Sequence, residues 1–172
     1  MLADESCFTQ LTICYAEAVL KRDYRGQDCS IARALEVVGE RWTLLVLRDA
    51  FLGFHRFEEF QESLGIARNV LTVRLNRLVE EGLLERVRYT ERPERYEYHL
   101  TQKGYDLDVA LAGFRQWGDT YISKTPPRIL RRRSDKKRVV AAFVPEGTKT
   151  LKRGDYENVP APGRSSRYPR SA

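Results

Sequence analysis

Apolar residues recur every three or four positions between residues 68 and 81, where the chain reads RNVLTVRLNRLVEE. An advance of 100° per residue brings Leu75 and Leu78 to within about 40° of Leu71 on one side of a helix. The opposite side then carries Asn69, Thr72, Val73 and Asn76, flanked by Arg68, Arg74 and Arg77. The pattern predicts an amphipathic helix whose leucine face packs on a core.

The same spacing predicts helices before this segment, over residues 8–22, 29–39, 43–53 and 56–65. Residues 43–53, TLLVLRDAFLG, are apolar on almost every side, which predicts a buried central helix. The helix over 56–65 ends at Gly65, and only Ile66 and Ala67 separate it from the helix that begins at Arg68. Two helices joined by so short a turn predict a helix-turn-helix motif.

The hydrophobic period changes to two after Gly82. The segments LLERVRY (83–89) and RYEYHLT (95–101) alternate around TERPE, whose proline and charges suit a hairpin tip. Helical spacing returns over residues 101–122. The order of elements predicts a mainly α fold with a small β-hairpin wing, a winged helix-turn-helix with flanking dimerisation helices. Nine leucine and aromatic residues are expected in its core: Trp42, Leu44, Leu45, Leu47, Phe57, Phe60, Tyr98, Leu100 and Trp117.

The charge balance changes after Ser123. Residues 1–123 hold 16 Lys and Arg against 20 Asp and Glu, a net charge of −4, whereas residues 124–172 hold 14 against 4, a net charge of +10. Within this basic part, RVVAAFVP and TKTLKRGDY predict a hairpin around Glu146–Gly147, followed by a disordered end. We therefore divide the chain into an N-terminal helix that contributes to a dimer (1–27), the winged-helix domain (28–123) and a basic C-terminal extension (124–172).

Composition argues against several classes of protein. The three cysteines form no Cys-x-x-Cys motif and there are only two histidines, so no metal site, cofactor or disulfide framework is expected. The chain has no glycine-rich phosphate loop and no recognisable nucleophile motif, which argues against an enzyme. No apolar run approaches the roughly 18 residues of a membrane span. A cytoplasmic protein with no membrane partner is therefore expected.

The polar face of residues 68–80 has the chemistry of a helix that enters the major groove of double-stranded DNA. An Asn side chain pairs with adenine through two hydrogen bonds, a Thr or Val contacts a thymine methyl group, and flanking arginines bind phosphates. In the hairpin, Arg92 and Arg95 suit the negative potential of the minor groove, although Glu91 and Glu94 oppose that contact. Three other interpretations stay open: a solvated amphipathic face, a protein-interaction module on a winged-helix scaffold, and RNA binding.

Three separated motifs resemble the HxlR-type winged-helix transcriptional regulators, relatives of MarR. They are CSIARALEVVGERWTLLVLRDAFLGFHRFEEFQ, LTVRLNRLVEEGLLER and ERYEYHLTQKG, and the resemblance covers about Asp28 to Tyr121. It implies a bacterial homodimer, often a repressor, with recognition helix 68–80 and wing 84–100. Because one winged helix contacts few base pairs, such a dimer reads a pseudo-palindromic operator. The resemblance also implies a phosphate contact for Arg56, for which a surface ion pair with Glu58 or Glu59 is the alternative.

Cys29 matches the cysteine that some members of this family use for redox sensing. A helix N-terminus and a neighbouring Arg25 or Arg33 favour the thiolate form, whereas the alternative is a small buried side chain. Ser30 follows where the family usually has proline and is expected to cap the helix. The implied effector is an oxidant or electrophile. A small molecule held by Trp42, Phe51 and Trp117 at the dimer interface is a further alternative.

Overall fold

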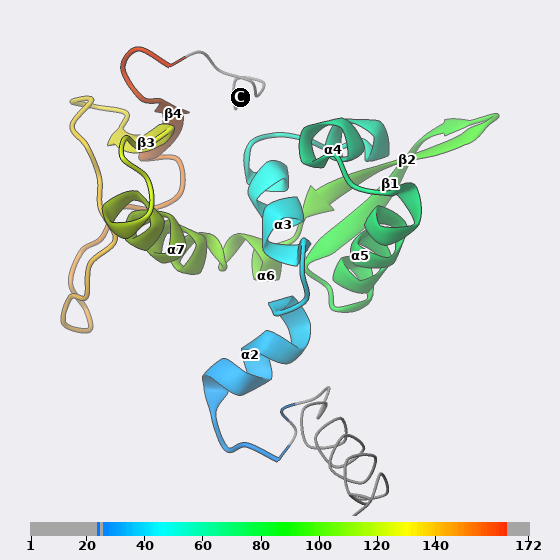
Figure 1. Cartoon of the computed structure of the whole chain (residues 1–172), viewed down its shortest axis with the longest axis horizontal. Helices are drawn as coiled ribbons and strands as arrows, with labels where there is room; N and C mark the ends of the chain where they lie inside the picture. The colour runs from blue at the N-terminus through cyan, green and yellow to red at the C-terminus, as the bar shows by residue number, and fades with distance from the viewer. Residues whose placement is uncertain (1–23, 25, 165–172) are drawn as a thin grey trace, which may run out of the picture. The chain divides into compact units, whose positions relative to one another are not determined.

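The computed structural model describes Tyr24 and residues 26–164 (Figure 1). Its internal contacts divide the chain into two units, residues 1–40 and 41–172, which we describe separately. In the described part of the first unit, helix α2 (Ser30–Val38) ends at Gly39, whose N–H donates to the carbonyl of Leu35 at 2.7 Å. The helix predicted over residues 8–22 lies outside the described residues.

The second unit contains the predicted winged helix. Its elements are α3 (Thr43–Phe51), α4 (Phe57–Leu64), α5 (Arg68–Glu80), β1 (Leu84–Glu91), β2 (Glu94–Leu100), α6 (Gln102–Tyr105) and α7 (Asp108–Tyr121). Strands β1 and β2 pair antiparallel from Leu84 opposite Leu100 to Glu91 opposite Glu94, and in Figure 1 they project as a long hairpin. A mainly α fold with a small β wing is therefore confirmed.

The core of the winged helix consists of apolar side chains from α3, α4, α5 and the base of the wing. The fully buried members include Val46, Leu47, Phe60, Leu71, Leu75, Leu78 and Leu84. Burying one leucine side chain stabilises a fold by roughly 1.5–3 kcal/mol. Because α5 contributes three buried leucines at helical spacing, its rotation is fixed and its polar face is turned to solvent.

The turn between α4 and α5 is as short as the sequence predicts. Gly65 has φ of 62°, a left-handed conformation that costs glycine little, and its N–H donates to the carbonyl of Gln61 at 2.9 Å. Ile66 is buried and anchors the turn to the core. Ala67 is the N-cap of α5 and provides no side-chain hydrogen bond, so this helix begins without the usual cap.

The structure corrects the single helix expected over residues 101–122, which is divided into α6 and α7. Thr101 caps the start of α6, because its Oγ1 donates to the carbonyl of Gly82 at 2.6 Å and accepts from the N–H of Gly104 at 3.1 Å. The division itself is a turn at Asp106 and Leu107, where the N–H of Leu107 donates to the carbonyl of Gly104 at 3.2 Å. The placement of Leu45 and Trp117 in the core was also wrong, since their side chains are 39% and 58% exposed.

The predicted hairpin in the basic extension was wrong. A turn exists at Glu146–Gly147, but the residues on either side of it form no strand. Instead, β3 (Arg128–Arg132) pairs antiparallel with β4 (Tyr156–Pro160). This pairing buries Leu130 and places Arg131 opposite Glu157, whereas the segment predicted as a strand leaves Val140 and Phe143 exposed.

Candidate nucleic-acid interface

The face of α5 opposite the buried leucines carries the four residues predicted to contact bases. Asn69, Thr72, Val73 and Asn76 are all exposed, and the Val73 side chain is 57% exposed although it is apolar. Thr72 donates its hydroxyl to the carbonyl of Arg68 at 2.9 Å, so its methyl group is the part suited to a thymine. The structure thus gathers the four predicted residues on one solvent-facing surface.

The arginines that flank this face are not equivalent. Arg68 is exposed and its guanidinium carbon lies 4.8 Å from the centre of the Phe57 ring, which orients the side chain without neutralising it. Arg77 is held 2.6 Å from the carboxylate of Glu81 and 4.0 Å from that of Glu80. Arg74 is half-buried. Arg68 is therefore the flanking arginine that is best placed for a phosphate.

Arg56 precedes α4 and is joined to the wing. Its Nε lies 3.0 Å from Oε1 of Glu97 in β2, and its guanidinium carbon lies 4.8 Å from the centre of the Tyr89 ring in β1. This hydrogen bond raises the pKa of Arg56 and lowers the pKa of Glu97. Glu59 instead accepts the backbone N–H of Arg56 at 2.8 Å, so the surface ion pair of Arg56 is made with Glu97 and not with Glu58 or Glu59, as the alternative interpretation had it.

The sequence interpretation missed both partners of Arg56. The two segments of the chain are 41 residues apart, and the charge pattern of neither one points to the other. The isolated bridge between Arg56 and Glu97 brings them together, with the N–H of Tyr98 donating to the carbonyl of His55 at 2.8 Å. The pair can therefore be recognised only in the folded chain, where the wing packs against the start of α4.

The wing presents its arginines in two environments. Arg88 lies 3.7 Å from Glu91 and 3.4 Å from Glu94, and Arg86 lies over the Tyr96 ring at 4.3 Å. The two arginines predicted to enter the minor groove, Arg92 and Arg95, are exposed and form no ion pair with any described residue. The tip of the wing therefore carries two cations that can contact a phosphate or the minor groove without first breaking an ion pair.

Two histidines stack beside the Arg56–Glu97 pair. The rings of His55 and His99 are 4.4 Å apart, and Nε2 of His99 lies 3.2 Å from Oε2 of Glu97.

No group of three His, Cys, Asp or Glu residues suited to a metal ion occurs among the residues that the structure describes. In that same part of the chain, no helix is both long enough and apolar enough to cross a membrane.

Cys29, the predicted redox residue, is the N-cap of α2 and is exposed, which contradicts the buried alternative. Ser30 is the first residue of the helix, so the expectation that it caps α2 was wrong. Arg33 forms an ion pair with Asp28 at 2.7 Å.

Of the aromatic residues suggested for a small-molecule pocket, Phe51 packs edge-on against Tyr105 with ring centres 5.8 Å apart, and Trp117 packs against Tyr121 with ring centres 5.6 Å apart.

Comparison with known proteins agrees with this geometry. Residues 37–126 match the model of the HxlR-like helix-turn-helix family. An uncharacterized HTH-type transcriptional regulator of Mycobacterium bovis is 50% identical over 116 residues, which are 66% of this chain and 73% of that protein. The uncharacterized HTH-type transcriptional regulator YdeP of Bacillus subtilis is 30% identical over 103 residues, which are 58% of this chain and 80% of YdeP.

Two solved structures have the same fold. PA1607, described as a candidate transcription factor, is 38% identical with a TM-score of 0.61, and the match covers 81% of this chain and 95% of PA1607. The oxidized form of the redox regulator HypR is 28% identical with a TM-score of 0.51, and the match covers 55% of this chain and 99% of HypR. The family match spans more than half of the chain, and its two helices and wing are the ones described above. The chain therefore belongs to the HxlR-like helix-turn-helix family and is a winged helix-turn-helix transcriptional regulator.

Proposed function

We propose that this protein is a sequence-specific DNA-binding repressor that acts as a homodimer on a pseudo-palindromic operator. The observation that carries the proposal is the exposed face of α5, where Asn69, Thr72, Val73 and Asn76 lie opposite three buried leucines. That face combines base-reading amides with small apolar groups and has no acidic residue, as a helix in the major groove requires. Double-stranded DNA is the partner that fits this chemistry.

The remaining contacts divide into phosphate and groove contacts. Arg56 and Arg68 flank the helix-turn-helix and suit the phosphate backbone, with Arg74 and Arg77 further along α5. Arg92 and Arg95 at the tip of the wing suit the adjacent minor groove. Such contacts fix the orientation of α5 in the groove, and α5 then reads the sequence.

Dimerisation follows from the small number of base pairs that one winged helix contacts. Helix α7 supports it, because Phe114, Trp117 and Tyr121 on this helix are 61%, 58% and 72% exposed. Contiguous exposed aromatic side chains on a monomer usually mark a protein contact. A dimer bound across a promoter excludes the transcription machinery from it, which is why we propose repression.

A response to oxidants or electrophiles through Cys29 is the second part of the proposal. The thiol is exposed at the start of α2, where an oxidant can reach it. HypR, whose structure this chain resembles, is a redox regulator. Oxidation of Cys29 would add a polar or cross-linked group at a helix N-terminus and would thereby alter the operator affinity of the dimer.

The alternative function is a protein-interaction module on the same scaffold. Arg56, Arg77 and Arg88 are already paired with glutamates of the same chain, and these pairs reduce the attraction for phosphates. Such a module has no use for the exposed amides of α5. DNA binding therefore accounts for more of the described surface.

The experiment that tests the proposal is a titration of the full chain against the DNA upstream of its own gene, with an excess of random duplex as competitor. A complex that survives the competitor, with two protomers per duplex, is the expected result. Binding that the competitor abolishes would leave only non-specific phosphate attraction. The same result with duplexes selected from a random-sequence pool would refute sequence-specific recognition and favour the interaction module.

A further inference from the structure

The basic extension is the largest part of the described chain that the proposed function leaves unassigned. Residues 124–164 hold 12 Lys and Arg against 4 Asp and Glu, a net charge of +8. Because residues 1–123 carry a net charge of −4, the positive charge of the protein is concentrated in this extension. The contacts of the folded chain show where these positive charges lie.

The extension is packed on the winged helix and does not trail from it. Tyr156 of β4 donates its hydroxyl to the carboxylate of Asp108 in α7. Gln116 of α7 donates to the carbonyl of Ala141 at 3.1 Å and accepts its N–H at 2.9 Å. These contacts attach the extension at two separate places along its sequence, so its cations are held beside the domain.

One carboxylate of β4 is shared among three cations. Glu157 lies 2.7 Å from Arg131, 3.1 Å from Lys136 and 3.6 Å from Arg133. The hydrogen bonds from Lys136 and Arg131 lower the pKa of Glu157, so this carboxylate stays ionised. A single negative charge neutralises one of three cations and leaves a surplus of positive charge at this place.

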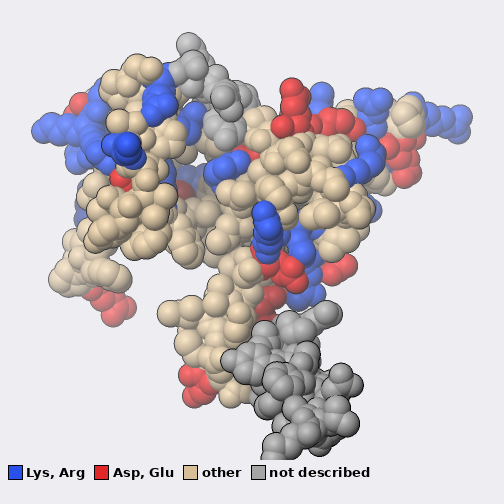
Figure 2. Space-filling view, viewed as in Figure 1, with Lys and Arg blue, Asp and Glu red and all other residues tan. Residues whose placement is uncertain are grey.

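The neighbouring cations add to that surplus. Arg132 lies 3.6 Å from Asp135, whereas Lys137 and Arg138 are exposed and form no ion pair with a described residue. We use the term basic surface for Arg131, Arg132, Arg133, Lys136, Lys137 and Arg138. On the face drawn in Figure 2, blue side chains dominate over the region of β3 and β4, whereas blue and red alternate along the wing.

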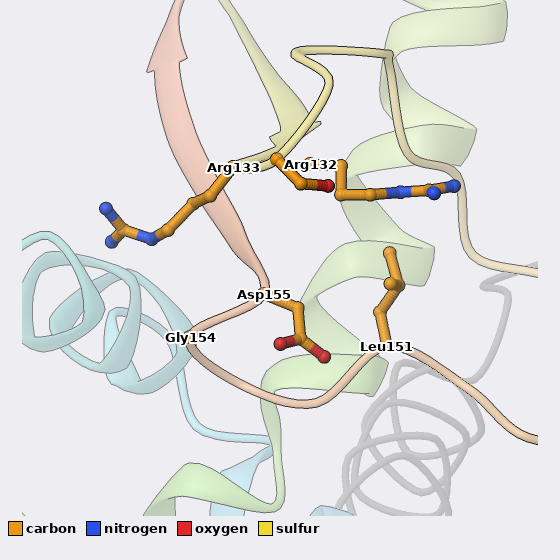
Figure 3. A pocket seen from close by; sticks show the side chains of 6 residues that line it. Arg132, Arg133, Leu151, Gly154 and Asp155 are labelled. Carbon is orange, nitrogen blue, oxygen red and sulfur yellow. The ribbon is translucent and has the colours of Figure 1, made fainter.

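The arginine side chains in this region do not converge on a single point. A hollow of about 430 Å³ is lined by Arg132, Arg133, Ser134, Leu151, Gly154 and Asp155. Figure 3 shows that the side chains of Arg132 and Arg133 lead away from each other on either side of it, and that the Asp155 carboxylate lies on its other wall. The guanidinium groups therefore diverge over a broad surface, which suits an extended polyanion.

Three arginines of the winged helix are already paired with carboxylates, whereas Arg68, Arg92 and Arg95 are cations of this domain without an ion pair to a described residue. Arg56, Arg77 and Arg88 each lie within 3.4 Å of a glutamate of the same chain, at 3.0, 2.6 and 3.4 Å. A phosphate must compete with that glutamate for the arginine, which lowers the gain from each contact. Non-specific affinity for DNA comes from cations that displace condensed counterions. The basic surface can supply this contribution.

We propose that the basic surface of the extension binds the phosphate backbone of duplex DNA outside the operator that α5 reads. This inference rests on the proposed DNA-binding function and adds a second contact to it. The extension increases affinity and length of DNA occupied, while sequence preference stays with α5. It also makes binding strongly dependent on salt.

The test uses the full chain and its variant with Arg132→Gln, Arg133→Gln, Lys136→Gln and Lys137→Gln. All four side chains are exposed and none lies in the core, and far-UV circular dichroism checks the fold. Two duplexes carry the same operator, selected by the wild-type chain from a random pool. One spans about 20 base pairs, enough for two half-sites one turn apart, and the other about 40 base pairs.

The variant is expected to lose about tenfold or more in affinity for the long duplex, with little change on the short one. The slope of log K against log salt is expected to become shallower by up to about 3.6, at roughly 0.9 for each phosphate contact. The matched control, with Arg132→Lys, Arg133→Lys, Lys136→Arg and Lys137→Arg, keeps the charge and is expected to bind as the wild type does.

Equal affinities of wild type and variant for the long duplex would overturn the inference, as would equal losses on both duplexes. Single-stranded RNA that competes for the basic surface better than duplex DNA would also overturn it, in favour of an RNA partner. If the proposed function itself is wrong, the wild-type chain selects no operator from the pool and binds all duplexes with equal affinity.

Discussion

The Nε atom of Arg56 lies 3.0 Å from Oε1 of Glu97, so the residue that precedes α4 is joined to strand β2 of the wing. The Tyr89 ring on β1 lies against the same guanidinium at 4.8 Å. One arginine thus belongs to both parts of the candidate interface. Because Arg56 is held by the fold and does not contact the base-reading face of α5, its contribution to DNA binding should not depend on sequence.

This arrangement predicts a division of labour between Arg56 and Asn76. Asn76→Ala removes an exposed amide from the middle of α5 and is expected to reduce preference for the operator by roughly 1–3 kcal/mol. Arg56→Ala is expected to weaken operator and random duplex by similar factors, because it removes the phosphate contact that we propose for this residue. Parallel titrations of both duplexes with each variant measure the two effects.

Gln102→Ala on α6 is the control for this pair, since its exposed side chain lies outside the candidate interface and bonds to Asp106. It should leave both affinities unchanged. Equal losses on operator and random duplex for both Asn76→Ala and Arg56→Ala would falsify the division of labour.

A second prediction concerns the stability of the junction between the wing and α6. An added Cβ at Gly104 would lie 2.2 Å from the carbonyl oxygen of Leu83, and the backbone there cannot move aside easily. Gly104→Ala is therefore expected to destabilise the fold by about 1–3 kcal/mol through overpacking. Urea unfolding, followed by tryptophan fluorescence, measures the change in the free energy of unfolding.

Gly113→Ala provides a matched control within α7. A Cβ at this position meets no atom within 4 Å, and the residue lies in the interior of a helix. Alanine has a higher helix propensity than glycine by about 1 kcal/mol. The control is expected to stabilise the protein slightly, so a stability loss in both variants would contradict the explanation from close contact at Gly104.

The sequence alone was sufficient for the helix-turn-helix and the wing because their signals are local. The leucine spacing of α5 and the alternation along β1 and β2 each predict one element and the side of it that is buried. The face of α5 that carries Asn69 and Asn76 follows directly from that spacing. The resemblance to a family then supplied the role of these residues.

The parts that were mispredicted depend on contacts between distant residues. Glu97 became the partner of Arg56 only because the wing packs beside the start of α4. Likewise, β3 pairs with β4 across a long connection, where Leu130 is buried and Glu157 meets Arg131. Local alternation in residues 138–145 suggested a nearer partner. The hydrophobic pattern of a segment does not show which distant segment it will pair with.

A third prediction uses the hydrogen bond by which Tyr156 attaches the extension to α7. Burial and the bond to Asp108 raise the pKa of Tyr156 above its usual value near 10. The neutral phenol is thus favoured in the folded state. Its stabilising contribution is complete below about pH 10 and is lost as the pH rises toward the raised pKa.

Urea unfolding at pH 8 and pH 11 tests this relationship. The free energy of unfolding of the wild-type chain is expected to fall more between these two values than that of Tyr156→Phe. At pH 8, Tyr156→Phe should be less stable by roughly 1–3 kcal/mol, since the partly buried carboxylate of Asp108 loses a donor. Tyr121→Phe, on an exposed side chain, should follow the wild type at both values. Identical slopes for all three proteins would rule out the linkage.

A fourth prediction follows from the exposed thiol of Cys29. Treatment with hydrogen peroxide is expected to change the operator affinity of the wild-type chain, and dithiothreitol is expected to restore it if the product is a sulfenic acid or a disulfide. Cys29→Ser should not respond, whereas Cys7→Ser and Cys14→Ser should respond as the wild type does. An unaltered response in Cys29→Ser would remove this residue as the sensor.

The last prediction concerns the exposed aromatic face of α7. Phe114, Trp117 and Tyr121 together leave an area on the order of a few hundred Å² uncovered, since one aromatic side chain buries about 150–250 Å². A stable interface needs about 800 Å² from each partner, so this face can supply a large share of one. Trp117→Glu would place a charge at its centre, where burial without a partner costs several kcal/mol.

Sedimentation of the full chain is expected to give a dimer for the wild type and a monomer for Trp117→Glu at the same micromolar concentration. Thr148→Glu adds the same charge to an exposed loop and should remain dimeric. The monomeric variant should also lose affinity for the whole operator but keep its weaker affinity for a half-site, because α5 is intact. A Trp117→Glu variant that sediments as a dimer would exclude α7 from the interface, and pairing of the two half-sites would then depend on another surface of the chain.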